Sequence, residues 1–112
     1  MIPDAPIFVA WYAFATWALD RAESFPKSSR FTYGQRLVNL CLEFEEVLVD
    51  ALYSREKQGK LQFLNRRLSV MRIMIRRCTD RRMLSQKQYQ HAGREIERIG
   101  RMLGGWIKQQ SR

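Results

Sequence analysis

The sequence has few of the residues that hold a small protein together through covalent or metal bonds. Its 112 residues include two cysteines, one histidine and three prolines. Cys41 and Cys78 fall at apolar helical positions, and we expect both to be small core residues without a disulfide or a metal ion. All three prolines lie within the first 26 residues, so no proline interrupts a helix further along the chain.

Long hydrophobic runs are also missing. The apolar run from Ile7 to Leu19 is thirteen residues long, whereas a helix that spans a bilayer needs about 20 residues. No basic residue precedes this run, although a signal peptide requires one. We therefore expect a buried first helix in a cytoplasmic protein that has no membrane partner.

The motifs of common catalytic sites are missing as well. The chain has no GxSxG motif, no P-loop, no HExxH motif and no group of carboxylates around a histidine. We therefore expect no catalytic residue and no cofactor, which leaves a binding protein or a structural protein.

Helical periodicity, in contrast, extends over most of the chain. Apolar residues recur three and four positions apart, which predicts an all-α protein: an antiparallel up-down four-helix bundle in a single domain over residues 1–112. We expect helices over about residues 6–23, 32–55, 60–82 and 86–109. Thr32 is the expected N-cap of the second helix, and Gly59 marks the break before the third. Ser85 and Gln88 form a capping-box pattern before the fourth.

The third and fourth predicted helices carry apolar or small side chains over more of their surface than the core of one bundle needs. The third helix carries a second apolar stripe beside its core seam. The fourth carries three glycines that project within about 40° of one another, given 100° per residue. Because each glycine costs about 1 kcal/mol relative to alanine in a helix, we expect a second copy of the chain to approach closely there. The predicted interface of a homo-oligomer consists of Phe63, Val70, Met74, Gly93, Gly100 and Gly104.

Positive charge is in excess and is concentrated in the second half of the chain. Twenty Lys and Arg against eleven Asp and Glu give a net charge of +9. Residues 57–79 contain seven bases and no acid. Arginine suits phosphate because its planar fork donates two parallel hydrogen bonds. The predicted nucleic-acid-binding residues are Arg66, Arg72, Arg76, Arg77, Arg81, Arg94, Arg98 and Arg101.

Two other interpretations of this charge stay open. The basic residues can form a solvated helix face, or they can pair with the second helix, where residues 37–54 contain four acids and no base. Arg67 falls inside the apolar arc of the third helix, so we expect it to be an interface or ion-pair residue.

Several short motifs are shared with one known family. The clearest are Phe25-Pro26-Lys27, Phe31-Thr32, Gly34-Gln35-Arg36, the pair Arg72 and Arg76, and the stretch from Gly100 to Ile107. With a similarity that extends from Tyr12 to Lys108, the chain resembles the accessory variability determinant family of diversity-generating retroelements. This family lies within a broader four-helix-bundle group that includes the proteins encoded in intervening sequences of ribosomal RNA genes.

The resemblance implies a barrel-like homopentamer of four-helix bundles with a strongly basic surface and no catalytic site. It implies three partners: the reverse transcriptase of the same element, its template RNA and the RNA–cDNA hybrid. The protein would then be a non-catalytic nucleic-acid-binding accessory protein that supports mutagenic cDNA synthesis at adenines, which diversifies a target gene. The alternative is a structural or RNA-associated oligomer of the ribosomal intervening-sequence type.

Overall fold

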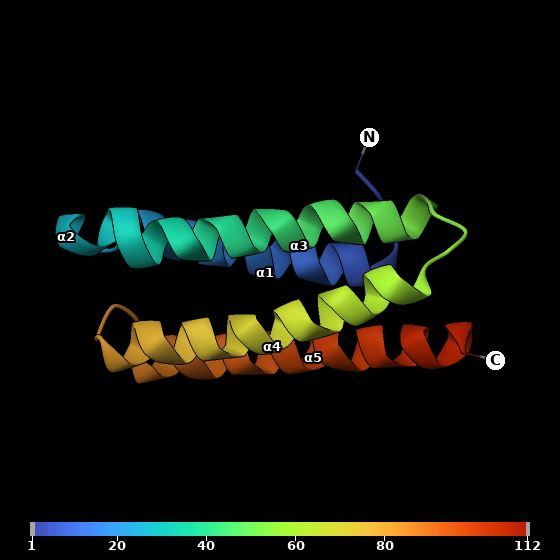
Figure 1. Ribbon diagram of the computed structural model, residues 1–112. Helices are drawn as coiled ribbons and strands as arrows, with labels where there is room; N and C mark the ends of the chain where they lie inside the picture. The colour runs from blue at the N-terminus through green and yellow to red at the C-terminus, as the bar shows by residue number, and fades with distance from the viewer. Residues whose placement is uncertain (1, 112) are drawn as a thin grey trace.

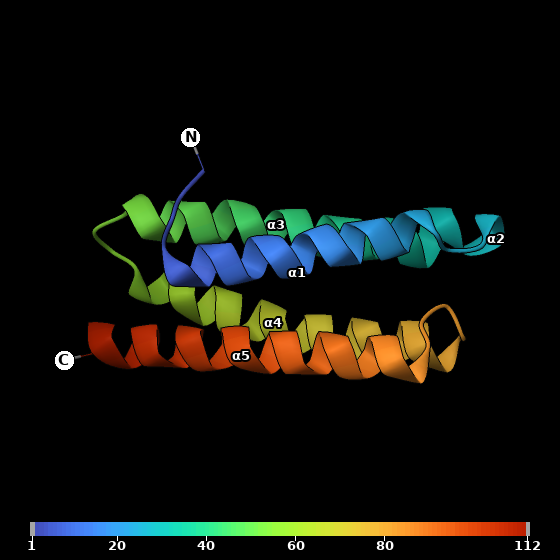
Figure 2. The same cartoon turned by 180° about the vertical axis from the view of Figure 1, so that it is seen from behind.

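A computed structural model describes residues 2–111 of the protein (Figures 1 and 2), and these residues contain helices and no strand. The all-α prediction is therefore confirmed. The elements in chain order are α1 (Pro6–Glu23), α2 (Lys27–Ser29), the π-helical turn η1 (Arg30–Gly34), α3 (Gln35–Tyr53), α4 (Gln58–Asp80) and α5 (Gln86–Gln110).

The long helices run alternately up and down and form two layers. α1 packs against α3 and α5, and α4 packs against the same two helices. Both views show α1 beside α3 in one layer and α4 beside α5 in the other. The bundle measures 46 × 25 × 21 Å. Within residues 2–111, no helix combines the length and the apolar composition that a membrane crossing requires.

One apolar face of each long helix fills the space between the layers. Trp11 of α1 stacks on Phe44 of α3, with the ring centroids 3.9 Å apart. Burial of one such large side chain stabilises the fold by about 1.5–3 kcal/mol. Cys41 and Cys78 are buried and form no disulfide, as the sequence predicts. Other large side chains that are almost fully buried include Phe14, Phe25, Leu37, Leu48, Leu61, Leu64, Leu68, Met71, Ile75 and Ile96.

The start of the second long helix differs from the prediction. Helical backbone resumes at Lys27, directly after Pro26, and passes through η1 into α3. Thr32 is therefore not an N-cap, and its hydroxyl donates a hydrogen bond to the Ser29 carbonyl at 3.2 Å. Gly34 packs closely against the end of α1, since a Cβ atom there would lie 3.4 Å from the Ala22 carbonyl oxygen. A contact between distant segments thus sets this boundary.

The break between α3 and α4 falls at residues 54–57, before the predicted position at Gly59. Lys57 explains this difference, because its ammonium donates a hydrogen bond of 2.7 Å to the Ala51 carbonyl at the end of α3. The same ammonium lies 5.7 Å from the ring centroid of Trp106 in α5. A cation at a helix C-terminus donates hydrogen bonds to the free carbonyls there and interacts favourably with the helix dipole. Gly59 consequently lies in the first turn of α4.

The turn between α4 and α5 follows standard helix-end chemistry. α4 ends at Asp80, and Arg82 adopts the left-handed conformation with a φ of 63°. Ser85 begins α5 through the predicted capping box, which is confirmed. Its hydroxyl accepts a hydrogen bond from the Gln88 amide at 3.1 Å, and its own amide donates to the Gln88 side chain at 2.9 Å.

Candidate nucleic-acid interface

The predicted phosphate-binding arginines lie on α4, on α5 and in the turn that joins them, and all are exposed to solvent. At 100° per residue, Arg66 and Arg77 point away from the core of α4, and Arg94 and Arg98 point away from the core of α5. Two pairs therefore cover the outside of the α4–α5 layer. Arg81 lies apart from them, because its guanidinium packs over the Tyr33 ring of η1 at 5.3 Å.

Arg72 leans from α4 toward α5 and covers Gly100. A Cβ atom on Gly100 would lie 2.9 Å from an Nη atom of Arg72 and 3.4 Å from a methyl group of Leu68. A side chain on Gly100 would therefore displace the guanidinium of Arg72. Whether it also lies at an interface between copies stays a prediction.

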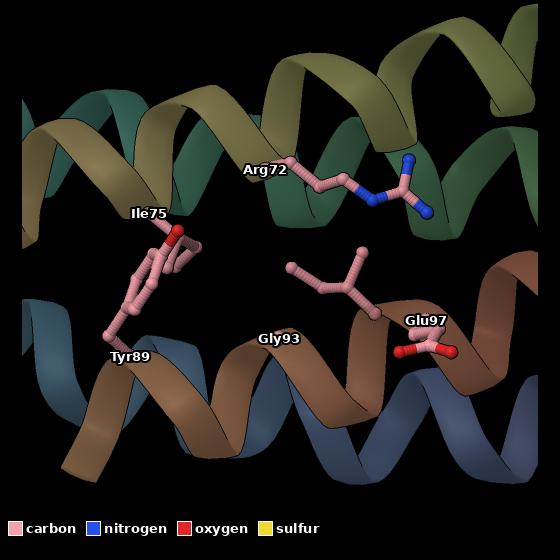
Figure 3. A pocket seen from close by; sticks show the side chains of 6 residues that line it. Arg72, Ile75, Tyr89, Gly93 and Glu97 are labelled. Atoms are coloured by element: carbon pink, nitrogen blue, oxygen red, sulfur yellow. The ribbon is translucent and has the colours of Figure 1, made fainter. Parts of the chain in front are cut away.

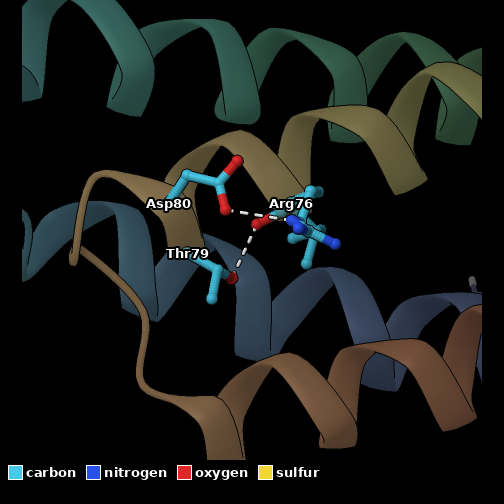
Figure 4. A network of polar contacts seen from close by, with 4 residues as sticks. Arg76, Thr79 and Asp80 are labelled. Carbon is cyan, nitrogen blue, oxygen red and sulfur yellow. Dashed lines mark hydrogen bonds and ion pairs between the residues drawn. The ribbon is translucent and has the colours of Figure 1, made fainter.

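Arg76 is held on the surface by one carboxylate and one ring. Its Nε donates a hydrogen bond to Asp80 at 2.9 Å, one helical turn further on (Figure 4). Its guanidinium lies 5.9 Å from the ring centroid of Tyr89 in α5. The Asp80 hydrogen bond raises the pKa of Arg76 above its ordinary value, and Tyr89 contributes in the same direction. Both members of the pair are exposed, at 64% and 59%, so a phosphate can displace Asp80 easily.

Arg67 forms the ion pair that the sequence suggested. Its Nε lies 2.9 Å from a carboxylate oxygen of Glu43 on α3, and its guanidinium lies 5.1 Å from the Phe63 ring centroid. The N–H is not directed at the oxygen, so this contact is electrostatic without hydrogen-bond geometry. It is the one ion pair between α3 and α4 in the described residues. The acidic helix α3 therefore forms an ion pair with no other arginine of α4.

The eight predicted arginines are mostly free of ion pairs. Of these eight, only Arg76 and Arg101 pair with a carboxylate within residues 2–111, and each has its partner one turn away on its own helix. Arg101 donates to Glu97 at 2.8 Å. Exposed pairs of this kind contribute little stability. The outer face of the α4–α5 layer therefore has a surplus of positive charge that is available to an external anion.

Two adjoining pockets lie along this layer, and Arg72 lines both. The first, of about 220 Å³, lies between α4 and α5 and is lined by Arg72, Ile75, Tyr89, Gly93, Ile96 and Glu97 (Figure 3). The second, of about 410 Å³, is lined by Arg72, Ile73, Arg76, Arg77 and Asp80. Sequence reasoning missed Tyr89, Glu97 and Asp80 as members of this region. Asp80 and Glu97 each had a local signal, which is a spacing of four residues from Arg76 and from Arg101.

The predicted interface residues lie on two different sides of the molecule. Phe63, Val70 and Met74 are half-buried on the flank of α4 that faces α3. Gly93 and Gly104 lie on α5, where an added Cβ atom would meet nothing within 4 Å. That these two surfaces meet in an assembly stays a prediction.

The described residues offer no group of three or more His, Cys, Asp or Glu side chains that could hold a metal ion. Burial raises the pKa of the Cys41 thiol to about 12, with a further contribution from the charge of Glu45. Burial also raises the pKa of Cys78 to about 11. Both thiols are therefore protonated near neutral pH and are poor nucleophiles.

Comparison with protein families agrees with the resemblance seen in the sequence. The model of the bAvd-like family matches residues 8–110. Curated proteins and solved structures gave no match. The matched family is an accessory, non-catalytic one, and the matched region covers α1 from Phe8 onward and the whole of α3, α4 and α5. The chain therefore belongs to the bAvd-like family.

Proposed function

We propose that this protein is a nucleic-acid-binding accessory protein of a diversity-generating retroelement. In this proposal it has no catalytic site of its own and acts in the cytoplasm with two partners, the reverse transcriptase of the same element and its template RNA. It supports mutagenic cDNA synthesis and also contacts the RNA–cDNA hybrid. The observation that carries the proposal is the surplus of unpaired arginines on the α4–α5 layer of a bAvd-like chain.

The arrangement of the arginines favours contact with a phosphate backbone. Arg72 and Arg76 are one turn apart, which separates them by about 6 Å along the helix axis. Arg77 lines the same pocket as these two. Arginines spaced in this way can hold neighbouring phosphates of one strand, and such contacts give affinity without sequence preference.

The placement of the predicted interface residues supports a closed ring of copies. Phe63 and Met74 lie on one flank of α4, whereas Gly93 and Gly104 lie on α5. Two different surfaces that meet head to tail form a ring when the rotation closes. We propose that the protein is a homo-oligomer of this kind, in agreement with the homopentameric barrel that the resemblance implies.

A reconstituted reaction tests this proposal. The reverse transcriptase and the template RNA of the same element are incubated with and without the protein, and cDNA yield and adenine errors are measured. The proposal predicts that the protein binds both components in a pull-down and that cDNA synthesis depends on it. A second reaction with the Arg72→Ala, Arg76→Ala double variant should yield less cDNA.

The opposite result would favour the other member of the four-helix-bundle group. If the protein binds neither partner and cDNA synthesis is unaffected, the proposal is wrong. A gene located inside a ribosomal RNA operon, with no reverse transcriptase nearby, would then indicate the intervening-sequence type. An adjacent reverse-transcriptase gene with a repeated variable region would support the retroelement.

A further inference from the structure

The first pocket between α4 and α5 differs in character from the arginine-covered surface around it. Its inner wall is apolar, because Ile75 and Ile96 are core residues. Tyr89 stands at one end, and the guanidinium of Arg72 and the carboxylate of Glu97 lie at the other (Figure 3). Gly93 leaves the outer wall open, since an added Cβ atom would meet nothing within 4 Å.

The polar groups of this pocket fit a ligand that has both hydrogen-bond donors and hydrogen-bond acceptors. Arg72 can only donate hydrogen bonds, whereas the Glu97 carboxylate can only accept them. These two described residues form no ion pair with each other, and Glu97 is held by Arg101 instead. A phosphate suits Arg72 but is repelled by Glu97. A flat, partly apolar group with acceptors on one edge and donors on the next fits better, and a nucleobase has this chemistry.

Among the four RNA bases, guanine matches the two groups best. Its Watson–Crick edge presents two adjacent donors, N1–H and the N2 amino group, which one carboxylate can accept together. Its O6 and N7 atoms are the acceptors that arginine binds in a bidentate manner. Adenine and cytosine offer one amino group, and uracil offers a single N–H. Single-stranded RNA exposes these edges because its bases can leave the stack.

We propose that this pocket binds an unstacked guanine of single-stranded RNA, with Glu97 on its Watson–Crick edge and Arg72 on O6 and N7. The inference rests on the proposed function, because it assumes that RNA is a ligand. The adjoining pocket, lined by Arg76 and Arg77, holds the flanking phosphates. Arg72 has five N–H donors and lines both pockets, so it contacts a phosphate with one edge and the base with the other.

The test compares short RNA oligonucleotides that differ at one position. An oligouridine of twelve nucleotides is measured against the same strand with one central guanosine, adenosine or inosine. Each good bidentate contact is worth about fivefold in affinity or more, so one guanosine held by two such contacts should improve the affinity of the wild-type protein by roughly thirtyfold. Inosine lacks the N2 amino group and should recover only part of the gain. Adenosine should give little.

Substitutions in α5 test whether the guanosine preference arises in this pocket. Gly93→Leu fills the pocket and should abolish the guanosine preference, which is measured as the ratio of the affinities of the same variant for the guanosine strand and for oligouridine. Gly105→Leu is the matched control, because its Cβ position is equally open but lies outside the pocket. It should keep the preference. Glu97→Gln loses one acceptor and should reduce the guanosine gain without filling the pocket.

Several outcomes would overturn the inference. Equal affinity for the guanosine and uridine strands refutes base binding and leaves the proposed function intact. A guanosine preference that survives in both Gly93→Leu and Glu97→Gln places the base elsewhere. Failure to bind any RNA refutes the proposed function and the inference together. Size measurement of each variant shows whether its assembly changes when the guanosine preference is lost. If the assembly of Gly93→Leu changes, the guanosine preference of Glu97→Gln decides whether the base binds in this pocket.

Discussion

Replacement of Gly100 by alanine separates the role of this glycine within one chain from a role between chains. The added methyl group would lie 2.9 Å from a terminal nitrogen of Arg72 and 3.4 Å from Leu68. The closer atom is the end of a flexible side chain, so Arg72 moves and the backbone of α5 does not. Alanine is favoured over glycine in a helix by about 1 kcal/mol, and a small shift of Leu68 offsets part of this gain.

Gly100→Ala should therefore raise the free energy of unfolding by about 0.5 kcal/mol and weaken RNA binding, because Arg72 no longer occupies its present position. The first effect is measured by urea unfolding followed by circular dichroism, and the second by RNA titration. Gly105→Ala is the control, since an added Cβ atom there has open space. It should stabilise α5 and leave RNA binding unchanged. Loss of more than about 1 kcal/mol in Gly100→Ala would refute this reasoning, and dissociation of an oligomer would show that Gly100 faces a second copy.

Three further predictions test the charge, the assembly and the buried thiols. Asp80→Asn removes the carboxylate that holds Arg76 and should raise RNA affinity roughly twofold at low salt, whereas unchanged affinity would place Arg76 outside the interface. Gly104→Leu should reduce the size of the proposed homo-oligomer in light scattering without loss of helix content, because its Cβ position is open within the chain; an oligomer of wild-type size would exclude this position from the interface. Burial raises the pKa of Cys41 from 9.0 to about 12, so the folded protein holds this proton more tightly than the unfolded chain does. That stabilisation is complete below pH 9 and is lost between pH 9 and pH 12. The unfolding free energy should fall more steeply over this range in the wild type than in Cys41→Ala, and parallel curves would contradict the buried thiol.

The core could be predicted from the sequence because helical periodicity is a local property. Leu61, Leu68 and Ile75 repeat at the spacing that places them on one face, and all three are buried in the structure. The capping box at Ser85 was equally local, since its hydrogen bonds connect residues three positions apart. The start of the second long helix could not be predicted from neighbouring residues, because Gly34 packs against a segment of α1.

The surface chemistry could be predicted in type but not in arrangement. The excess of arginine on α4 follows from composition, and its exposure follows from helical phase. The position of Arg72 over Gly100 and that of Arg76 near Tyr89 depend on how α4 packs against α5. No spacing within one helix encodes such contacts. The pocket that joins Arg72 to Glu97 was missed for the same reason.

The central claim is that the α4–α5 layer binds the phosphate backbone of RNA. Its most direct test is the affinity for single-stranded RNA across a salt series, for the wild type and for the Arg72→Ala, Arg76→Ala double variant. The double variant of Lys27→Ala and Arg55→Ala loses the same charge outside α4 and α5 and serves as control.

Circular dichroism and size measurement first establish that each variant is folded and assembled like the wild type. Removal of both arginines should then reduce the slope of log affinity against log salt by roughly two, about one for each lost phosphate contact. The control variant should change the slope much less. An unchanged slope and affinity in the folded Arg72→Ala, Arg76→Ala variant would contradict the claim.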